Sequence, residues 1–208
     1  MIFNDDKVAV ICFLRHGQTD WNKQQRMQGQ EEVPLNENGK REAWEAAEGF
    51  YISKCNGVSW DKIISSPLSR AKDTANAVAQ RIGFDNVTTD DRLLERDFGD
   101  LSGFGYTEYS IAVHSNVKAV ATIESTENML ARINEFIKDN VKVGEHVLIV
   151  THGAVTRFFA KSSEKQLSEA FPDYKDVIHN CHCAVYTYDG KEVVLKAYDI
   201  TSDNIYKV

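Results

Sequence analysis

The feature that most constrains this chain is a pair of apolar runs, each of which leads into a histidine and a glycine. Val8 to Leu14 is followed by Arg15-His16-Gly17, and Val147 to Val150 is followed by Thr151-His152-Gly153. A continuous, partly β-branched run of this kind is typical of a strand that is buried on both faces of a parallel sheet. The shorter run Ile63-Ile64 also precedes a turn and a helix-like segment. These patterns predict a parallel sheet whose strands end in polar residues.

Three amphipathic helices are predicted, because apolar residues recur at helical spacing in three segments. Ser66-Pro67 is predicted to supply the N-cap and the first-turn proline of the second helix, and Ser125 or Thr126 the N-cap of the third. The apolar positions are Ala43, Ala46, Ala47, Phe50 and Tyr51, then Leu68, Ala71, Ala75, Val78 and Ile82, and finally Met129, Leu130, Ile133, Phe136 and Ile137.

The order of these segments predicts the fold class. Asp189-Gly190 is a tight-turn signal between Cys183 to Tyr188 and Glu192 to Tyr198, which predicts a hairpin or two sequential strands. Strands that alternate with helices predict an α/β protein, a three-layer α/β/α sandwich with a mostly parallel central sheet. We expect a single domain over residues 1–208, in which the least patterned segment, about 103–124, forms a short lid or rim.

Charge and hydropathy narrow the classes of partner. The 208 residues carry 24 basic and 31 acidic side chains, a net charge of −7, whereas a nucleic-acid-binding protein needs a broad basic surface. No apolar run approaches the roughly 20 residues of a membrane span, and Met1 to Asp6 lacks the basic and apolar parts of a signal peptide. We therefore expect a cytoplasmic protein that binds neither nucleic acid nor membrane. A homodimer is compatible with the sequence.

The cysteines and most histidines are predicted to be structural. Cys12, Cys55, Cys181 and Cys183 are too few and too unevenly spaced for a disulfide framework, and three of them fall in predicted strands. In a strand, the two thiols of Cys181-His182-Cys183 would share one face while the histidine points away, so no metal site is predicted there. The histidines that we expect to be structural are His114, His146, His179 and His182.

Arginines and histidines are predicted to meet at one edge of the sheet. Open α/β sheets bind ligands at the carboxyl ends of their strands, where Arg15, His16 and His152 are placed. Arg70 lies in the first turn of a predicted helix, near the positive end of the helix dipole. On an acidic chain, such a small positive pocket suits a phosphoryl group, whose oxygens arginine binds in a bidentate manner.

Three further residues are predicted around this pocket. Asn22 follows the first strand closely enough to fold back over it, and Gly17 is expected to let the backbone approach a ligand. The segment Leu93 to Asp100 brings carboxylates next to apolar residues. We choose Glu95 as the proton donor to a leaving oxygen, because bulky neighbours would shield its carboxyl group from water and favour the protonated form.

Taken one at a time, these motifs also have structural explanations. Arginine and histidine after a strand often form ion pairs, and Ser65 to Arg70 alone is typical of an ordinary helix start. Leu93 to Asp97 alone is compatible with a solvated loop. Their order and combination favour a catalytic site.

In that combination the chain resembles the histidine phosphatase superfamily, also called phosphoglycerate mutase-like. The family's opening motif is matched by Leu14 to Asn22, and the resemblance spans Val8 to about Asp189. The later matches, in family order, are Arg26, Gln28-Gly29, Leu35, Gly39, Ser65 to Ala71, Glu95 with Phe98-Gly99, and Thr151-His152-Gly153. The resemblance implies a phosphoglycerate mutase-like fold.

The resemblance also implies roles for the matched residues. His16 would attack phosphorus, and no metal or other cofactor would be required because arginines stabilise the transferred group. Gln28 and Gly29 would either line the rim of the pocket as substrate-binding residues or hold the loop together. The remaining implied roles are phosphate binding by Arg15, Arg70, His152 and Asn22, and proton transfer to the leaving alcohol and from the attacking water by Glu95.

Three activities are compatible with the resemblance. Phosphoglycerate mutases of this family usually carry the motif Glu-Arg-His-Tyr-Gly at the acid, and in this chain Asp97 and Phe98 replace its histidine and tyrosine. The segment 103–124 is short, so water would be able to reach a phosphohistidine. Hydrolysis of a small phosphorylated metabolite is therefore expected, with a bisphosphoglycerate-primed mutase as the alternative. A catalytically silent, phospholigand-binding member is the third hypothesis, although every matched catalytic position is retained.

Overall fold

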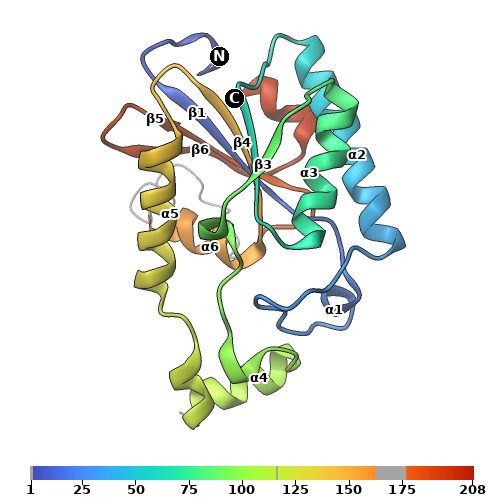
Figure 1. Ribbon diagram of the computed structural model, residues 1–208, viewed down its shortest axis with the longest axis vertical. Helices are drawn as coiled ribbons and strands as arrows, with labels where there is room; N and C mark the ends of the chain where they lie inside the picture. Colours follow the sequence, from blue (N-terminus) through green and yellow to red (C-terminus); the bar gives the residue numbers. More distant parts are fainter. Residues whose placement is uncertain (1, 116, 163–176) are drawn as a thin grey trace.

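The computed structural model describes residues 2–115, 117–162 and 177–208, and its centre is a six-stranded sheet in the order β3-β2-β4-β1-β5-β6 (Figure 1). The strands are β1 (Ala9–Arg15), β2 (Lys62–Ser65), β3 (Val87–Thr89), β4 (His146–Thr151), β5 (Cys183–Tyr188) and β6 (Val193–Ile200). The α-helices are α1 (Asp20–Lys23), α2 (Glu37–Cys55), α3 (Ser69–Ile82), α4 (Tyr106–His114), α5 (Thr126–Asn140) and α6 (Gly153–Lys161). Short 3-10 helices are η1 (Ile2–Asn4), η2 (Asp91–Leu93), η3 (Gly99–Leu101), η4 (Lys118–Thr122) and η5 (Ser202–Lys207).

The predicted three-layer α/β/α fold is confirmed, and the sheet is mixed. β1 to β4 run parallel, whereas β5 and β6 form an antiparallel hairpin that pairs with β1 through β5. Alternate residues of β1 face opposite layers: Val10, Cys12 and Leu14 pack with α2 and α3, and Ile11 and Phe13 pack with α5 and α6. Because both faces of β1 are covered, its side chains must be apolar until the strand reaches the edge of the sheet.

The predicted helix starts are partly confirmed. Ser125 caps α5, since its side chain accepts the Asn128 N–H bond at 3.0 Å. The predicted cap at Ser66-Pro67 is wrong: α3 begins at Ser69, and its N-cap, Leu68, makes no side-chain bond. The Ser66 hydroxyl is instead 2.8 Å from Nε2 of His152.

Gly17 is required by a backbone contact that the sequence did not indicate. A Cβ atom at Gly17 would lie 2.4 Å from the carbonyl oxygen of Gly39, and a Cβ atom at Gly39 would lie 1.9 Å from the carbonyl oxygen of Gln18. Both contacts are far inside van der Waals distance, so the two glycines are required for the loop after β1 to pack against the start of α2. The expected approach of Gly17 to a ligand stays a prediction.

The cysteines form no disulfide in the described part of the chain, which includes all four of them. Cys12 and Cys183 are buried in neighbouring strands, as predicted. Cys181 was expected in a strand, which is wrong, because it precedes β5 and has φ of 57°.

Residues 103–124 form α4 and η4, which lie with α1 beyond the carboxyl ends of the parallel strands (Figure 1). Backbone bonds join this segment to the loop after α1: Gly103 N–H donates to Met27 O at 2.7 Å and Tyr106 N–H donates to Gln25 O at 2.8 Å. The rim is therefore hydrogen-bonded to the loop after α1, which is the part of the chain that follows His16. Among the described helices, none combines the length and apolarity that crossing a bilayer demands.

Candidate active site

A cavity of about 360 Å³ opens where β1 and β4 end. This volume lies in the range of small-molecule sites. His152 lies behind the lining residues, with its ring 5.2 Å from the ring of His16. Six residues predicted from the sequence line the cavity: Arg15, His16, Asn22, Gln28, Arg70 and Glu95.

His16 is held as a neutral imidazole with one nitrogen available. Its Nδ1 lies 2.6 Å from the carbonyl oxygen of Gly17, and because a carbonyl only accepts, Nδ1 must carry the proton. Burial, followed by the charges of Arg70 and Arg15, lowers the pKa of His16 well below 6.5. At neutral pH, Nε2 therefore keeps an unprotonated lone pair.

His152 is fixed by the residue that was predicted to cap α3. Its Nε2 is 2.8 Å from the Ser66 hydroxyl, and its side chain is fully buried. Burial and the nearby Arg70 lower the pKa of His152 well below 6.5, so this ring is also neutral. A neutral imidazole can donate one hydrogen bond to an anion without adding a second positive charge beside the arginines.

Arg70 is buried and Arg15 is half-buried, and backbone carbonyls orient both arginines. Arg70 donates to Glu31 O at 2.7 Å and to Gly29 O at 2.8 Å, and Arg15 donates to Ile178 O at 2.5 Å. Burial lowers the pKa of Arg70 to about 10 and lowers that of Arg15, but both stay charged at neutral pH. These carbonyls fix the direction of each guanidinium group but supply no neutralising charge.

Three buried polar nitrogens of this site have no hydrogen-bond partner among the described residues: Nε of Arg15, Nε of Arg70 and Nδ1 of His152. An unpaired buried polar group costs about 1–3 kcal/mol, so such groups require an explanation. A bound oxyanion would accept bonds from all three. Gly153 makes room for this arrangement, because a Cβ atom there would approach Nε of Arg15 to 3.2 Å.

Glu95 lies at the amino end of α6 and is almost fully buried. Its carboxylate accepts the N–H bonds of Ala154 at 3.2 Å, Val155 at 3.3 Å and Arg96 at 2.9 Å. It is thus shielded from water, as predicted, but by backbone donors as well as by apolar neighbours. These donors hold the carboxyl group beside the cavity.

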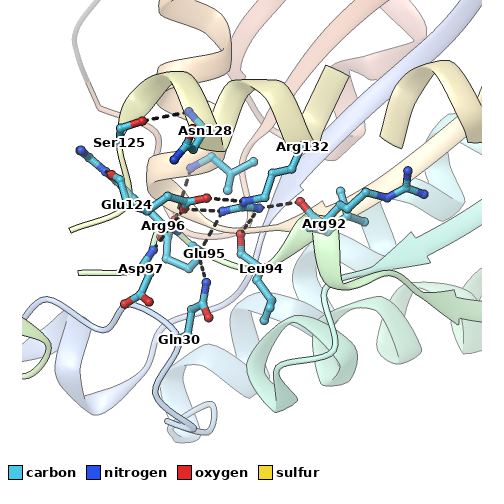
Figure 2. A network of polar contacts seen from close by, with 12 residues as sticks. Gln30, Arg92, Leu94, Glu95, Arg96, Asp97, Glu124, Ser125, Asn128 and Arg132 are labelled. Atoms are coloured by element: carbon cyan, nitrogen blue, oxygen red, sulfur yellow. Dashed lines mark hydrogen bonds and ion pairs between the residues drawn. The ribbon is translucent and has the colours of Figure 1, made fainter. Parts of the chain in front are cut away.

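A buried arginine supports the segment that carries Glu95, and Figure 2 shows its network. Arg132, on α5, donates to the carbonyl oxygens of Arg92 and Leu94 at 2.6 and 2.7 Å and to that of Glu95 at 3.2 Å. The same guanidinium forms a fork with Glu124, at 2.8 and 2.9 Å. One side chain therefore joins α5, the Glu95 segment and the end of the rim.

The remaining predicted residues either line the cavity or hold in place the residues that line it. Oδ1 of Asn22 accepts the Thr19 N–H bond at 3.1 Å, so its amide nitrogen is the part that can donate to a ligand. Gln28 lines the cavity and also accepts a 2.9 Å bond from the Thr19 hydroxyl, which helps to hold the loop, and substrate binding by Gln28 stays a prediction. Gly29, at φ 53°, places its carbonyl oxygen on Arg70 and acts as a support.

Sequence reasoning missed part of the cavity wall. Arg157 lies one helical turn after Gly153 on α6, and Tyr106 and Tyr109 lie one turn apart on α4, spacings that could have indicated a shared face. Arg26 and Phe98, which the family resemblance matched without a role, also line the wall, and the other missed wall residues, Met27, Ala154, Val177 and Ile178, give no comparable signal.

A second missed group supports the end of β1. Asn180 donates to His16 O at 2.8 Å, and Cys181 N–H donates to Arg15 O at 3.0 Å. The Arg15 N–H donates in return to His182 O at 3.1 Å. Residues 178–182 therefore hold the backbone that presents both Arg15 and His16, although more than 160 residues separate the two segments.

Comparison with known proteins agrees with this geometry. The family model described as histidine phosphatase superfamily (branch 1) matches residues 11–201. An uncharacterised phosphatase of Bacillus subtilis, PhoE, is 37% identical over 154 residues, which cover 71% of this chain and 73% of the relative. A 2,3-bisphosphoglycerate-dependent phosphoglycerate mutase of Parvibaculum lavamentivorans is 29% identical over 178 residues, 77% of this chain and 82% of that protein.

A solved structure is similar over nearly the whole chain. The mycobacterial glucosyl-3-phosphoglycerate phosphatase superposes with a TM-score of 0.71 at 26% identity, and the match covers 93% of this chain and 99% of that one.

Proposed function

The chain belongs to the histidine phosphatase superfamily, and from this premise we propose that it hydrolyses phosphate monoesters of small metabolites through a phosphohistidine on His16. The observation that carries the proposal is the state of His16. Its Nδ1 proton is held by Gly17 O, which leaves the Nε2 lone pair at a cavity with three unpartnered donors. A nucleophile and an oxyanion site thus occur together.

In the first half of the reaction, Nε2 of His16 forms a bond to phosphorus while the bond to the leaving oxygen breaks. Arg15, Arg70 and His152 bind the three non-bridging oxygens and stabilise the charge that they carry in the transition state. Glu95 gives a proton to the leaving oxygen, which departs as an alcohol. The product is a phosphohistidine and a Glu95 carboxylate.

In the second half, Glu95 takes a proton from a water molecule, whose oxygen attacks the phosphohistidine. The P–N bond breaks, inorganic phosphate leaves, and His16 returns to its neutral form. Glu95 is again protonated and ready for another ester. The N–H donors of α6 keep its carboxyl group in one place through both transfers.

Positive charge for phosphoryl transfer comes from the chain itself in this proposal. Two buried guanidinium groups replace the solvation of the phosphate oxygens and need no reorganisation during the reaction. We therefore expect turnover without a metal ion. The size of the cavity, about 360 Å³, favours small molecules as substrates.

The experiment is phosphate release from para-nitrophenyl phosphate and a panel of phosphorylated metabolites in the presence of EDTA. We expect release by the wild-type protein and none by His16→Ala, and an acid-labile, base-stable phosphoprotein after rapid quenching. Release that requires an added metal would contradict metal independence. Full activity of His16→Ala would exclude this nucleophile.

A mutase is the second candidate, because one relative at 29% identity is named as a bisphosphoglycerate-dependent mutase. The same phosphohistidine would then return its phosphoryl group to a glycerate instead of to water. Phosphoglycerate isomerisation, primed with bisphosphoglycerate, measures this directly. Isomerisation faster than phosphate release would favour the mutase, and release alone would favour the phosphatase.

A further inference from the structure

A second cluster of ionisable side chains lies outside the cavity. His179, His182 and Asp199 offer ligand atoms that all lie within 4.8 Å of one another. The Asp199 carboxylate contacts both rings through different oxygens, Nδ1 of His179 at 2.7 Å and Nδ1 of His182 at 3.0 Å. The two rings stand 5.2 Å apart. The histidines precede β5 and the aspartate lies near the end of β6, so the cluster joins two segments.

The cluster contains His182 of the motif Cys181-His182-Cys183 but neither of the two cysteines. Cys181 turns aside with φ of 57°, and Cys183 lies buried in β5 beside Cys12 of β1. His182 meets His179, three residues earlier, and Asp199 on the adjacent strand. The grouping depends on the β5–β6 pairing, in which Cys183 lies opposite Ile200, and the sequence alone does not indicate it.

We propose that His179, His182 and Asp199 bind a divalent metal ion of the zinc class. Two imidazoles and one carboxylate, with water in the fourth position, form a donor set typical of zinc. Metal–ligand bonds of about 2.0–2.1 Å place tetrahedral donor atoms roughly 3.3 Å apart. One ligand atom from each of the three residues lies within 4.8 Å of the other two, so the donors are gathered close to this spacing and complete it by side-chain rotation.

The proton balance of binding is simple. In the ion-free protein, His179 donates its Nδ1 proton to the Asp199 carboxylate, whereas His182 donates its Nδ1 proton to the Asp199 main-chain carbonyl oxygen at 3.0 Å, a bond that it gives up on binding the ion. When Nδ1 of each neutral ring becomes a metal ligand, its proton moves to Nε2 through solvent, and no oxidant or reductant is needed. The side chain of His179 is 65% exposed, so an ion and a water molecule can reach the cluster.

Electrostatics favour this cluster over the catalytic histidines. The hollow beside it is lined by the carboxylates Glu42, Glu45, Glu48 and Asp203 together with His179 and His182. Negative potential from these groups attracts a cation. His16 and His152, by contrast, lie among buried arginines that repel one.

The position of the cluster gives the ion a structural consequence. Residues 178–182 carry both histidines and also bond to the backbone of Arg15 and His16. An ion that fixes this segment to β6 would stabilise the end of β1 without contacting the substrate. The site is thus independent of the proposed catalytic chemistry, and its test does not require activity.

The test is titration of the chelator-treated protein with zinc chloride by calorimetry, and with Co²⁺ by visible absorption. We expect one ion per chain, bound at micromolar concentration or below, with Co²⁺ bands of a four-coordinate site. His179→Ala and Asp199→Asn should each weaken zinc binding by at least about 10-fold. Zinc should raise the melting temperature of the wild-type protein and not that of His179→Ala.

Two control variants make the result specific. His114→Ala removes an exposed histidine on α4 and should keep both binding and the thermal shift. His16→Ala should also keep zinc binding, because the catalytic ring is outside the cluster. Binding that disappears in His16→Ala but persists in His179→Ala would overturn the proposal, as would no binding at millimolar zinc. Asp199→Asn also weakens the hydrogen bonds that Asp199 accepts from His179, so a loss of zinc binding in this variant has two explanations. The decisive measurement is therefore zinc binding by folded His179→Ala protein.

Discussion

Glu95 accepts N–H bonds from the first turn of α6, and this determines which substitution tests its role as acid. Glutamine keeps one acceptor oxygen, which can retain the Val155 and Arg96 bonds that share Oε1, loses the Ala154 bond to Oε2, and removes the acidic proton. We expect Glu95→Gln to slow hydrolysis of alkyl phosphates by roughly 10² to 10⁴ and to affect activated aryl phosphates much less, because an aryl oxide leaves without protonation. Steady-state rates on a leaving-group series measure this, and equal slowing throughout would transfer the role to Asp97 or Asp100.

The two buried histidines predict how stability depends on pH. Their pKa values lie well below 6.5 in the folded protein, whereas the unfolded chain binds protons near pH 6.5. The unfolded state therefore holds more protons below pH 6.5, and stability falls as pH decreases from there toward the folded-state pKa values.

We expect each of these histidines to contribute up to about 1.4 kcal/mol per pH unit to this loss. Chemical denaturation between pH 7 and 5 measures the slope. His152→Gln should reduce it, whereas His114→Gln, at an exposed position, should leave it unchanged. A slope that is identical in wild type and His152→Gln would contradict the burial of a neutral ring.

The residues that meet at the candidate site could be predicted from the sequence because each lies in a short motif at the end of a strand or the start of a helix. Arg15, His16, Arg70 and His152 needed only local order and the rule that ligands bind at the carboxyl ends of strands. Their supports could not be predicted in this way. Ser66, Ile178 and Asn180 bond to residues that are 86 to 164 positions away, and a single sequence gives no register for such contacts.

Among the elements, α5 supports the segment that carries Glu95 through Arg132. This side chain joins α5 to the Glu95 segment and to Glu124, and the Arg132 and Glu124 side chains are only 17% and 16% exposed (Figure 2). Arg132→Leu removes the cationic partner of Glu124 and the arginine donor to three carbonyl oxygens, of which only that of Glu95 keeps a second donor, Gln30. We expect the free energy of unfolding to fall by about 3 kcal/mol, measured by urea denaturation.

Arg132→Lys tests whether this arginine also positions the acid. Lysine keeps the charge but cannot form the fork, so we expect kcat on alkyl phosphates to fall by about 10-fold or more. If Arg132 acts through Glu95, the Arg132→Lys change should have little further effect in a Glu95→Gln background. If the two substitutions instead lower kcat by independent factors that multiply in the double variant, Arg132 has a structural role alone.

The elements that periodicity predicted are those whose apolar side chains face the sheet. α3 and α5 bury every fourth or third residue, and the spacing is visible in the sequence. α4 was not predicted, because it buries only Ala112 and leaves Ile111 62% exposed. The antiparallel direction of β5 was left open, since a turn signal does not decide whether adjacent strands pair.

At the scale of the whole molecule, the rim and the loop after α1 close one side of the cavity together. Tyr109 lines that side and packs edge-to-face on Phe98, with ring centroids 5.5 Å apart. This wall lies beyond the phosphoryl end, so it should contact the alcohol part of a metabolite.

We expect Tyr109→Ala to raise KM for preferred metabolites by about 10-fold, from lost apolar contact, and to change para-nitrophenyl phosphate hydrolysis little. Ile111→Ala, on the exposed side of the same helix, is the matched control and should leave both substrates unaffected. Kinetics of the three proteins on both substrates measure the difference. Equal effects of the two substitutions would mean that α4 acts only through its fold.

The central position of β1 has a consequence for synthesis on the ribosome. Both of its neighbours, β4 and β5, come from the last third of the chain, and Asn180 is made 164 residues after His16. At a translation rate of about 5–20 residues per second, roughly 8 to 33 s therefore pass between the synthesis of β1, the most apolar strand, and the synthesis of the segments that it contacts. During that interval its exposed edges are a target for chaperones, and the nascent chain cannot assemble its nucleophile until translation is nearly finished.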